Sequence, residues 1–249
     1  MTLEADSTSS TGTWLTTLPA PDEEIVPGVF WGSPACLWTP AFWKSVVHHA
    51  GETLPQFGGQ EKPLSHTVAF CLLGGYGVTF ELNEAAFCRI LDAGLLEPGL
   101  KAEADAFEQC LSEPLRVNGR SIRYRFPRQR GKRLAAALAA LDADPPPADD
   151  VFAFRRNLMR IPGIGPKTAS WIARDWLGSD QVAILDIHLI RACQIMKLFP
   201  RGVKLPRDYD RLERRFLDFA SALGVRASVL DSIIWMEMRE APRLSRVLR

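Results

Sequence analysis

The stretch that decides the fold runs from Leu158 to Ala192 and reads LMRIPGIGPKTASWIARDWLGSDQVAILDIHLIRA. Its hairpin, residues 161–166, has two glycines two residues apart, which let the chain turn where a side chain would clash and let the backbone approach a ligand closely. Pro166 suits the first position of a helix, whose early amides have no partner within the helix. The hairpin therefore predicts two short helices joined by a tip with free amides.

Apolar residues recur at helical spacing on both sides of this hairpin. They are Val151, Phe154 and Leu158 before it, and Ala169, Ile172, Ala173 and Trp176 after it. A DNA phosphate suits the tip, because free amides and the helix dipole both favour negative charge there. We expect Gly163 and Gly165 to contact DNA. A purely structural helical hairpin would show the same pattern, so only the neighbouring residues can distinguish a DNA-binding hairpin from a structural one.

Lys167 and Asp186 are the residues that favour chemistry. Lys167 falls in the first turn of the second predicted helix, where the positive end of the dipole favours the neutral, nucleophilic amine. Asp186 interrupts an apolar run over 182–187, and a carboxylate there costs free energy unless it is paired, caps a helix or takes part in catalysis. We expect Asp186 to cap a helix over 187–198 and also to be catalytic. The alternative for Lys167 is a phosphate contact without chemistry.

These residues resemble the helix-hairpin-helix DNA glycosylase superfamily, which includes endonuclease III and the 8-oxoguanine DNA glycosylases. In that superfamily a lysine just after the hairpin attacks the sugar C1′ of the damaged nucleotide, and an aspartate in a VDxH or LDxH segment assists. The resemblance assigns these roles to Lys167 and Asp186 and places His188 near the DNA backbone. Members that only hydrolyse the glycosidic bond usually lack the lysine. The resemblance therefore implies a bifunctional glycosylase and lyase that needs no metal or organic cofactor.

Two further segments extend the resemblance. Residues 230–235 are similar to the LDxxxW helix of archaeal-type 8-oxoguanine glycosylases, in which the acid contacts the base edge and the tryptophan stacks on its face. Here these residues are Asp231 and Trp235, and a carboxylate can accept from the N1–H and the exocyclic amine of guanine. Trp171, on the helix face of Lys167, matches another pocket residue of that group. The alternative is that Trp171 and Trp235 are core residues.

Residues 71–79 resemble the segment of the superfamily whose side chain fills the gap left by the extruded base. Tyr76 occupies that place, and an aromatic ring can stack on the bases that remain. An ordinary turn at the end of a helix is the competing interpretation.

Charge is divided unevenly along the 249 residues. The net charge is +1, but residues 1–114 carry 4 Lys and Arg against 15 Asp and Glu, a balance of −11, whereas residues 115–249 carry 26 against 14, a balance of +12. The basic part includes a run over 115–141 without any acid. We expect this run to follow a DNA backbone in a strongly salt-dependent way. Its candidate contacts are Arg123, Arg125 and Arg128.

Composition is that of an ordinary soluble globular protein, with 47% hydrophobic and 24% charged residues. The five cysteines show neither CxxC pairs nor metal-ligand spacing, which is typical of reduced thiols in a protein without a metal site. The start of the chain lacks the features of a signal peptide, and no segment has the length and apolarity of a membrane span. We expect a cytoplasmic, nucleoid-associated monomer whose partner is double-stranded DNA.

The periodicity predicts an all-α fold, with helices over 40–49, 64–73, 83–93, 101–112, 131–141, 150–160, 166–177, 187–198, 208–223 and 226–239. By resemblance we expect a central helical barrel over 60–185, which contains the helix-hairpin-helix at 150–177. A second helical domain combines 28–59 with 186–249, and the active site lies in the cleft between them. Residues 1–27 are expected to be flexible.

Two alternatives to an enzyme for 8-oxoguanine remain open. The same scaffold could act on another modified guanine, for instance in a defence pathway. A helix-hairpin-helix protein could also bind DNA without turnover.

Overall fold

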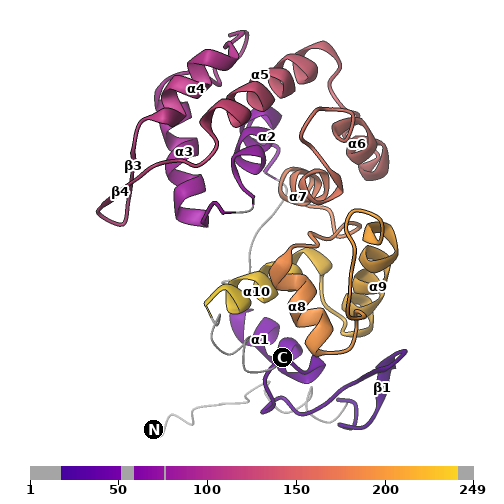
Figure 1. Cartoon of the computed structure of the whole chain (residues 1–249). Coiled ribbons are helices and arrows are strands. Elements are labelled where there is room, and N and C mark those ends of the chain that lie inside the picture. The colour runs from indigo at the N-terminus through magenta and orange to yellow at the C-terminus, as the bar shows by residue number, and fades with distance from the viewer. Residues whose placement is uncertain (1–17, 52–58, 76, 241–249) are drawn as a thin grey trace, which may run out of the picture.

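A computed structural model of the chain describes residues 18–51, 59–75 and 77–240. Within these ranges ten helices and two antiparallel hairpins form two lobes, with α7 at their junction (Figure 1). The all-α fold predicted from the sequence is confirmed. The helices are α1 (Pro40–Ala50), α2 (Leu64–Leu73), α3 (Phe80–Asp92), α4 (Ala104–Ser112), α5 (Pro127–Ala143), α6 (Val151–Leu158), α7 (Pro166–Leu177), α8 (Ile187–Ile195), α9 (Tyr209–Ala222) and α10 (Ala227–Glu240).

Local sequence explains where the helices begin and end. Four of them start at a residue whose side chain accepts a first-turn amide, namely Thr39, Thr79, Asp150 and Asp186. Because Thr79 provides this cap, α3 starts at Phe80, earlier than predicted. Pro166 occupies the first position of α7, and Gly178, in the left-handed region with φ 67°, ends it. Every helix predicted from the sequence is present.

The two hairpins were not predicted. β1 (Glu24–Val26) pairs with β2 (Val29–Phe30) around Gly28, whose φ is 79°. Part of the N-terminal stretch predicted as flexible is therefore a paired strand. β3 (Leu115–Val117) pairs with β4 (Arg120–Ile122) around the turn Asn118-Gly119, where both residues have positive φ. Strands of two or three residues are too short for their alternation to stand out in the sequence.

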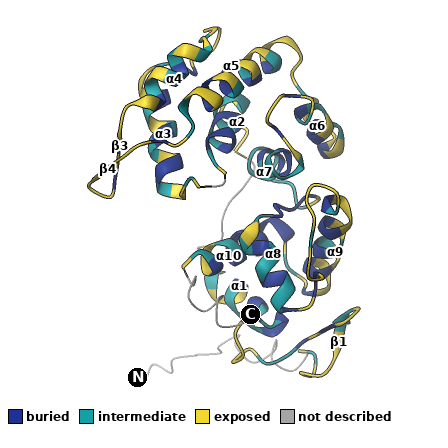
Figure 2. Ribbon diagram, in the orientation of Figure 1, coloured by how far each residue is buried: buried dark blue, intermediate teal, exposed yellow. Residues whose placement is uncertain are grey.

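Buried apolar residues form two clusters among the described residues. One combines residues 29–47 with 183–238 and includes Trp43, Phe216 and Phe219. The other lies within residues 68–182 and includes Phe107 and Phe154. Figure 2 shows buried residues turned toward the interior of each lobe. The predicted domain bounds, 60–185 against 28–59 with 186–249, remain a proposal, which the change of cluster at residue 183 favours.

The last two helices, α9 and α10, supply much of the first cluster, with Leu212, Phe216 and Phe219 on one and Leu230 and Ile234 on the other. In the part of the chain that the structure describes, no single helix has the length and apolarity to cross a membrane. Only α9 and α10 taken together meet that test, and a bend of 100° separates them.

Candidate active site

The hairpin between α6 and α7 has one packed and one open glycine. Gly163 has a φ of 94°, and a Cβ there would lie 2.6 Å from Cδ of Arg133. At Gly165, no described atom lies within 4 Å of the place where a Cβ would be. Gly165 is also the residue before α7 and has no side chain to cap its first turn. The tip is therefore open, with helix-start amides that a ligand can reach.

Lys167 lies in the first turn of α7, and its ammonium lies over the indole of Trp171. The distance from Nζ to the ring centroid is 5.4 Å, which is within the range of a cation–π contact. Trp171 is held from several sides: Nε1 donates to Asp175 at 2.8 Å, and Phe70 meets the ring edge-on at 5.8 Å. A Cβ at Gly74 would lie 3.1 Å from the same ring. The structure thus places Trp171 directly beside the candidate nucleophile.

Asp186 caps α8, as expected. Its Oδ1 accepts the amides of His188 and Leu189, at 2.9 and 2.8 Å. The half-buried side chain follows the buried run 182–185. Because one oxygen serves both amides, the other remains available to a second partner. The cap is therefore compatible with a catalytic role.

Asp231 lies in a polar network between the lobes and is 3% exposed. One carboxylate oxygen accepts from Arg174 and from the Ser232 hydroxyl, and the other accepts the Ile184 amide at 3.2 Å. Burial raises the pKa of Asp231 to about 6, although Arg174 opposes that shift. Both oxygens are engaged, and the one that accepts the Ile184 amide has a second lone pair. The base contact of Asp231 stays a prediction.

This network links α7 to the segment that directly precedes Asp186. Lys167, Trp171 and Arg174 are four and three residues apart, and therefore share one side of the helix. Arg174 pairs with Asp231, and Asp231 binds the amide two residues before Asp186. Figure 1 shows α7 at the junction of the lobes, above α8 and α10.

A chain of aromatic contacts joins the two tryptophans predicted to bind the base. Phe70 meets Phe80 at 6.1 Å, and Phe80 meets Trp235 at 5.6 Å, both edge-on. The imidazole of His188 meets Trp235 edge-on, with 6.4 Å between the ring centroids. In the described part of the chain, the buried Nδ1 of His188 has no hydrogen-bond partner. This nitrogen is shielded from solvent in the structure, and the DNA contact of His188 remains a prediction.

Arg239 covers the end of this aromatic chain and was missed at the sequence level, as were Phe70 and Phe80. Its guanidinium lies 4.9 Å from the centroid of Trp235 and 5.6 Å from that of Phe80, and it pairs with Glu81 at 3.0 Å. No local signal marks these residues, since Phe70 and Phe80 fit the apolar faces of their helices. Among the described residues, no three His, Cys, Asp or Glu side chains gather as metal ligands would.

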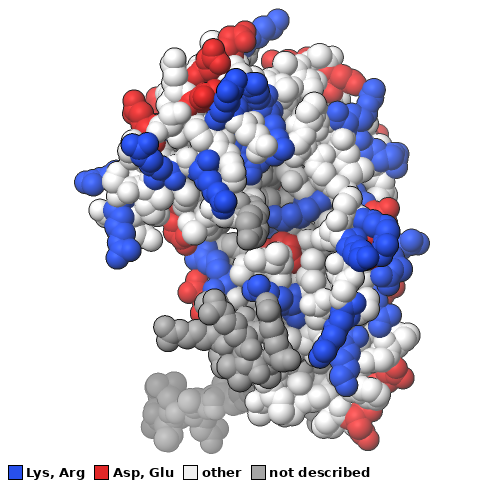
Figure 3. Space-filling view, viewed as in Figure 1, with Lys and Arg blue, Asp and Glu red and all other residues white. Residues whose placement is uncertain are grey.

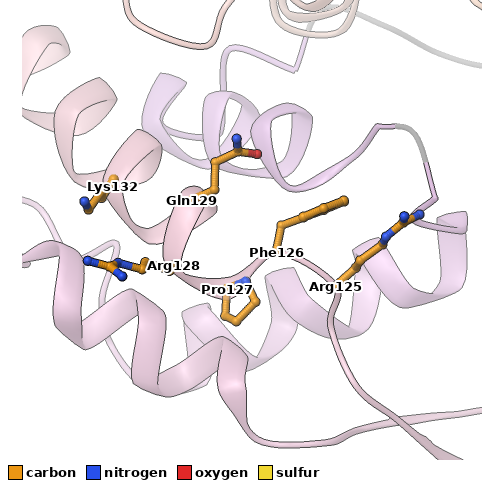
Figure 4. A pocket seen from close by; sticks show the side chains of 6 residues that line it. All are labelled: Arg125, Phe126, Pro127, Arg128, Gln129 and Lys132. Carbon is orange, nitrogen blue, oxygen red and sulfur yellow. The ribbon is translucent and has the colours of Figure 1, made fainter.

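The basic run over 115–141 folds into the β3–β4 hairpin, a connecting turn and most of α5. Arg123, Arg125 and Arg128 are exposed, as a surface for DNA requires. A pocket of about 440 Å³ opens here, and Figure 4 shows Arg128 and Lys132 on one side of it and Phe126 pointing toward Arg125. Figure 3 shows lysine and arginine side chains over this region and again near α9. Tyr76 lies outside the described residues, so its insertion into DNA stays a prediction.

A helical hairpin with an open glycine tip, followed by a lysine and an aspartate at the junction of two lobes, defines the helix-hairpin-helix class of DNA-acting enzymes. The family model for 8-oxoguanine DNA glycosylase matches residues 83–225, which is more than half of the chain. The chain therefore belongs to the 8-oxoguanine DNA glycosylase family.

Solved structures share this fold. The 8-oxoguanine DNA glycosylase of Methanocaldococcus jannaschii is 22% identical, with a TM-score of 0.59 over 79% of this chain and 93% of that one. The enzyme of Thermotoga maritima is 24% identical, with a TM-score of 0.56 over 80% and 88%. A complex of the M. jannaschii glycosylase/lyase with 15mer DNA containing 8-oxoguanine is 22% identical and gives a TM-score of 0.54 over 80% and 88%. No curated protein matches the chain.

Proposed function

We propose that this protein excises 8-oxoguanine from double-stranded DNA and then cleaves the strand through a Schiff base on Lys167. Membership of the 8-oxoguanine DNA glycosylase family supports the glycosylase activity. The observation that supports the lyase activity is the place of Lys167, in the first turn of α7 directly behind an open glycine tip. The similar M. jannaschii protein is a glycosylase/lyase.

DNA binding begins at the hairpin. The amides at the open tip take a phosphate, and the exposed arginines of the basic run follow the backbone. His188 contacts the backbone near the everted nucleotide, and Tyr76 fills the gap left in the stack. The proposed contacts are Gly163, Gly165, His188, Tyr76, Arg123, Arg125 and Arg128.

The everted purine enters between the lobes. Eversion costs a few kcal/mol, which favours bases that are already poorly paired. Trp171 and Trp235 provide aromatic faces for the ring, and Asp231 provides the acceptor for its N1–H edge. Phe70 and Phe80 keep these two tryptophans in fixed relation.

Lys167 and Asp186 then carry out the chemistry. Asp186 takes a proton from the Lys167 ammonium and stabilises the positive charge that grows on the sugar. The amine lone pair forms a bond to C1′, and the electrons of the glycosidic bond leave with the base, which is protonated. Ring opening gives a Schiff base. Loss of a C2′ proton then expels the 3′ phosphate and nicks the strand.

Borohydride trapping tests this proposal. Borohydride should reduce the Schiff base and give a covalent complex between wild-type protein and a duplex containing 8-oxoguanine. Lys167→Gln should abolish trapping and leave DNA affinity within about twofold, because the phosphate contacts of the tip remain.

The alternatives predict other outcomes in the same assay. A DNA-binding protein without turnover would bind the duplex and show neither trapping nor base release on any lesion. An enzyme for another modified guanine would be trapped on that lesion and not on 8-oxoguanine. Either result would refute the proposed substrate or the proposed activity.

A further inference from the structure

Three consecutive amides directly before Asp186 each donate to a buried side chain of α9 or α10. Glu213 and Tyr209 of α9 accept the amides of residues 183 and 185, at 3.0 and 3.3 Å. Asp231 of α10 accepts the amide of residue 184 at 3.2 Å. The Tyr209 hydroxyl also donates to the carbonyl of residue 183 at 2.7 Å, and burial raises its pKa, which keeps the proton in place. Each of the three residues before Asp186, 183–185, is thus fixed by a hydrogen bond from its amide to a side chain of α9 or α10.

Both carboxylates in this set are tied to the helix-hairpin-helix. Arg155 of α6 donates to Glu213 at 2.5 Å, and Ser170 of α7 donates to the same carboxylate at 3.2 Å. Arg174 of α7 pairs with Asp231. Arg155 is 8% exposed and Glu213 is 4% exposed. Removing two charges from water costs free energy that their attraction barely offsets, so stability alone is a weak reason for a buried pair.

The geometry points to a different use for this pair. We infer that Arg155 and Glu213 are positioning residues, which fix the Asp186 segment relative to the helix of Lys167. The inference rests on the proposed function, since it concerns the distance between the two groups proposed to react. Neither residue touches the reacting atoms. A displacement of about 1 Å between reacting groups can lower a rate about a hundredfold.

Glu213→Gln tests the inference with little change of shape. The amide oxygen still accepts from residue 183, but it cannot neutralise the buried Arg155. We expect single-turnover excision of 8-oxoguanine to fall about tenfold or more, with DNA affinity within about twofold. The matched control is Asp210→Asn, because Asp210 also faces Arg155, at 3.5 Å, but is 78% exposed. This control should keep the wild-type rate.

A double-mutant cycle separates positioning from general loss of structure. If Glu213 acts through Asp186, Glu213→Gln should cost little further rate in an Asp186→Asn background. The same full loss in both backgrounds would overturn the inference.

An apolar replacement of the pair tests the inference even if Glu213→Gln fails to fold. Arg155→Met combined with Glu213→Leu removes both charges together, which buried sites often tolerate. We expect this protein to unfold cooperatively, at a temperature a few degrees below wild type, and still to excise slowly, because the amide of residue 183 has lost its acceptor. A folded double variant with the wild-type rate would overturn the inference.

These outcomes can be told apart from failure of the proposed function. Absence of trapping by wild-type protein would refute the function, whereas normal trapping with equal rates for wild type and Glu213→Gln would refute only the positioning role. Amide hydrogen exchange at residues 183–185 reports the restraint without any activity. Faster exchange in Glu213→Gln than in Asp210→Asn supports the inference, and equal exchange contradicts it.

Discussion

The hydrogen bonds of Asp231 depend on its protonation state, and its pKa lies close to neutral pH. Its carboxylate accepts from Arg174 and from the Ile184 amide, and burial raises its pKa to about 6. Protonation below that pH replaces an acceptor with a donor and weakens both contacts. Because burial disfavours the charged form, Asp231 binds its proton more tightly in the folded protein than in the unfolded chain. Its contribution to the free energy of unfolding is therefore complete below the ordinary pKa of 3.8 and is lost as the pH rises through about 6.

We expect single-turnover excision by the wild-type protein to rise with pH through about 6 and then to level off. Asp231→Asn mimics the neutral form. It should therefore be close to wild type at about pH 5 and about tenfold slower or more at about pH 8. Quenched-flow rates across this range provide the measurement. A variant that is equally slow at both pH values would show that titration of Asp231 does not control the step.

At the scale of elements, the two glycines of the hairpin between α6 and α7 differ in their surroundings: Gly163 is packed against Arg133, whereas Gly165 faces open space. Gly163→Ala should cost about 1–2 kcal/mol of unfolding free energy, because its φ of 94° is unfavourable for an L side chain and Arg133 occupies the space. Gly165→Ala meets no described atom within 4 Å and should unfold like wild type.

Of these two variants, Gly165→Ala should lose DNA affinity although it keeps wild-type stability. A methyl group at Gly165 would lie beside the first amides of α7, where we propose that a phosphate binds, so DNA affinity should weaken about tenfold in fluorescence anisotropy. Denaturant unfolding provides the stability half of the comparison. Unchanged affinity of Gly165→Ala would mean that DNA does not approach this side of the tip.

The helices could be predicted because their signals are local. Asp150, Pro166 and Asp186 mark helix starts within one or two residues, and the apolar faces repeat over two or more turns. The pairs that hold the site could not be predicted, since Arg155 and Glu213 are 58 residues apart and Arg174 and Asp231 are 57 apart. Only the packing of α6 and α7 against α9 and α10 brings such residues together.

For the whole molecule, the division of charge matters more than the total. Residues 115–249, which include β3, β4 and α5 to α10, carry a net +12, whereas residues 1–114 carry −11. DNA affinity should therefore fall steeply with salt in spite of a net charge of +1.

Replacing Arg123, Arg125 or Arg128 with glutamine should lower the slope of log Kd against log salt by about 1 for each residue, because each phosphate contact releases about one counterion. Titrations at several salt concentrations measure the slope. Lys101→Gln, an exposed change in the acidic part of the chain, should leave it unaltered. The same slope for all four variants would mean that the basic run does not contact the backbone.

Gly74 sets how much room exists beside Trp171. A methyl group there would lie 3.1 Å from the indole, which Phe70 also meets from another direction. The ring consequently has little freedom to move, and with Trp171 in its proposed place in the base pocket, the size of the base that fits there depends on Gly74. Engineering toward bulkier adducts should begin by exchanging the indole for a smaller ring and leave this glycine unchanged.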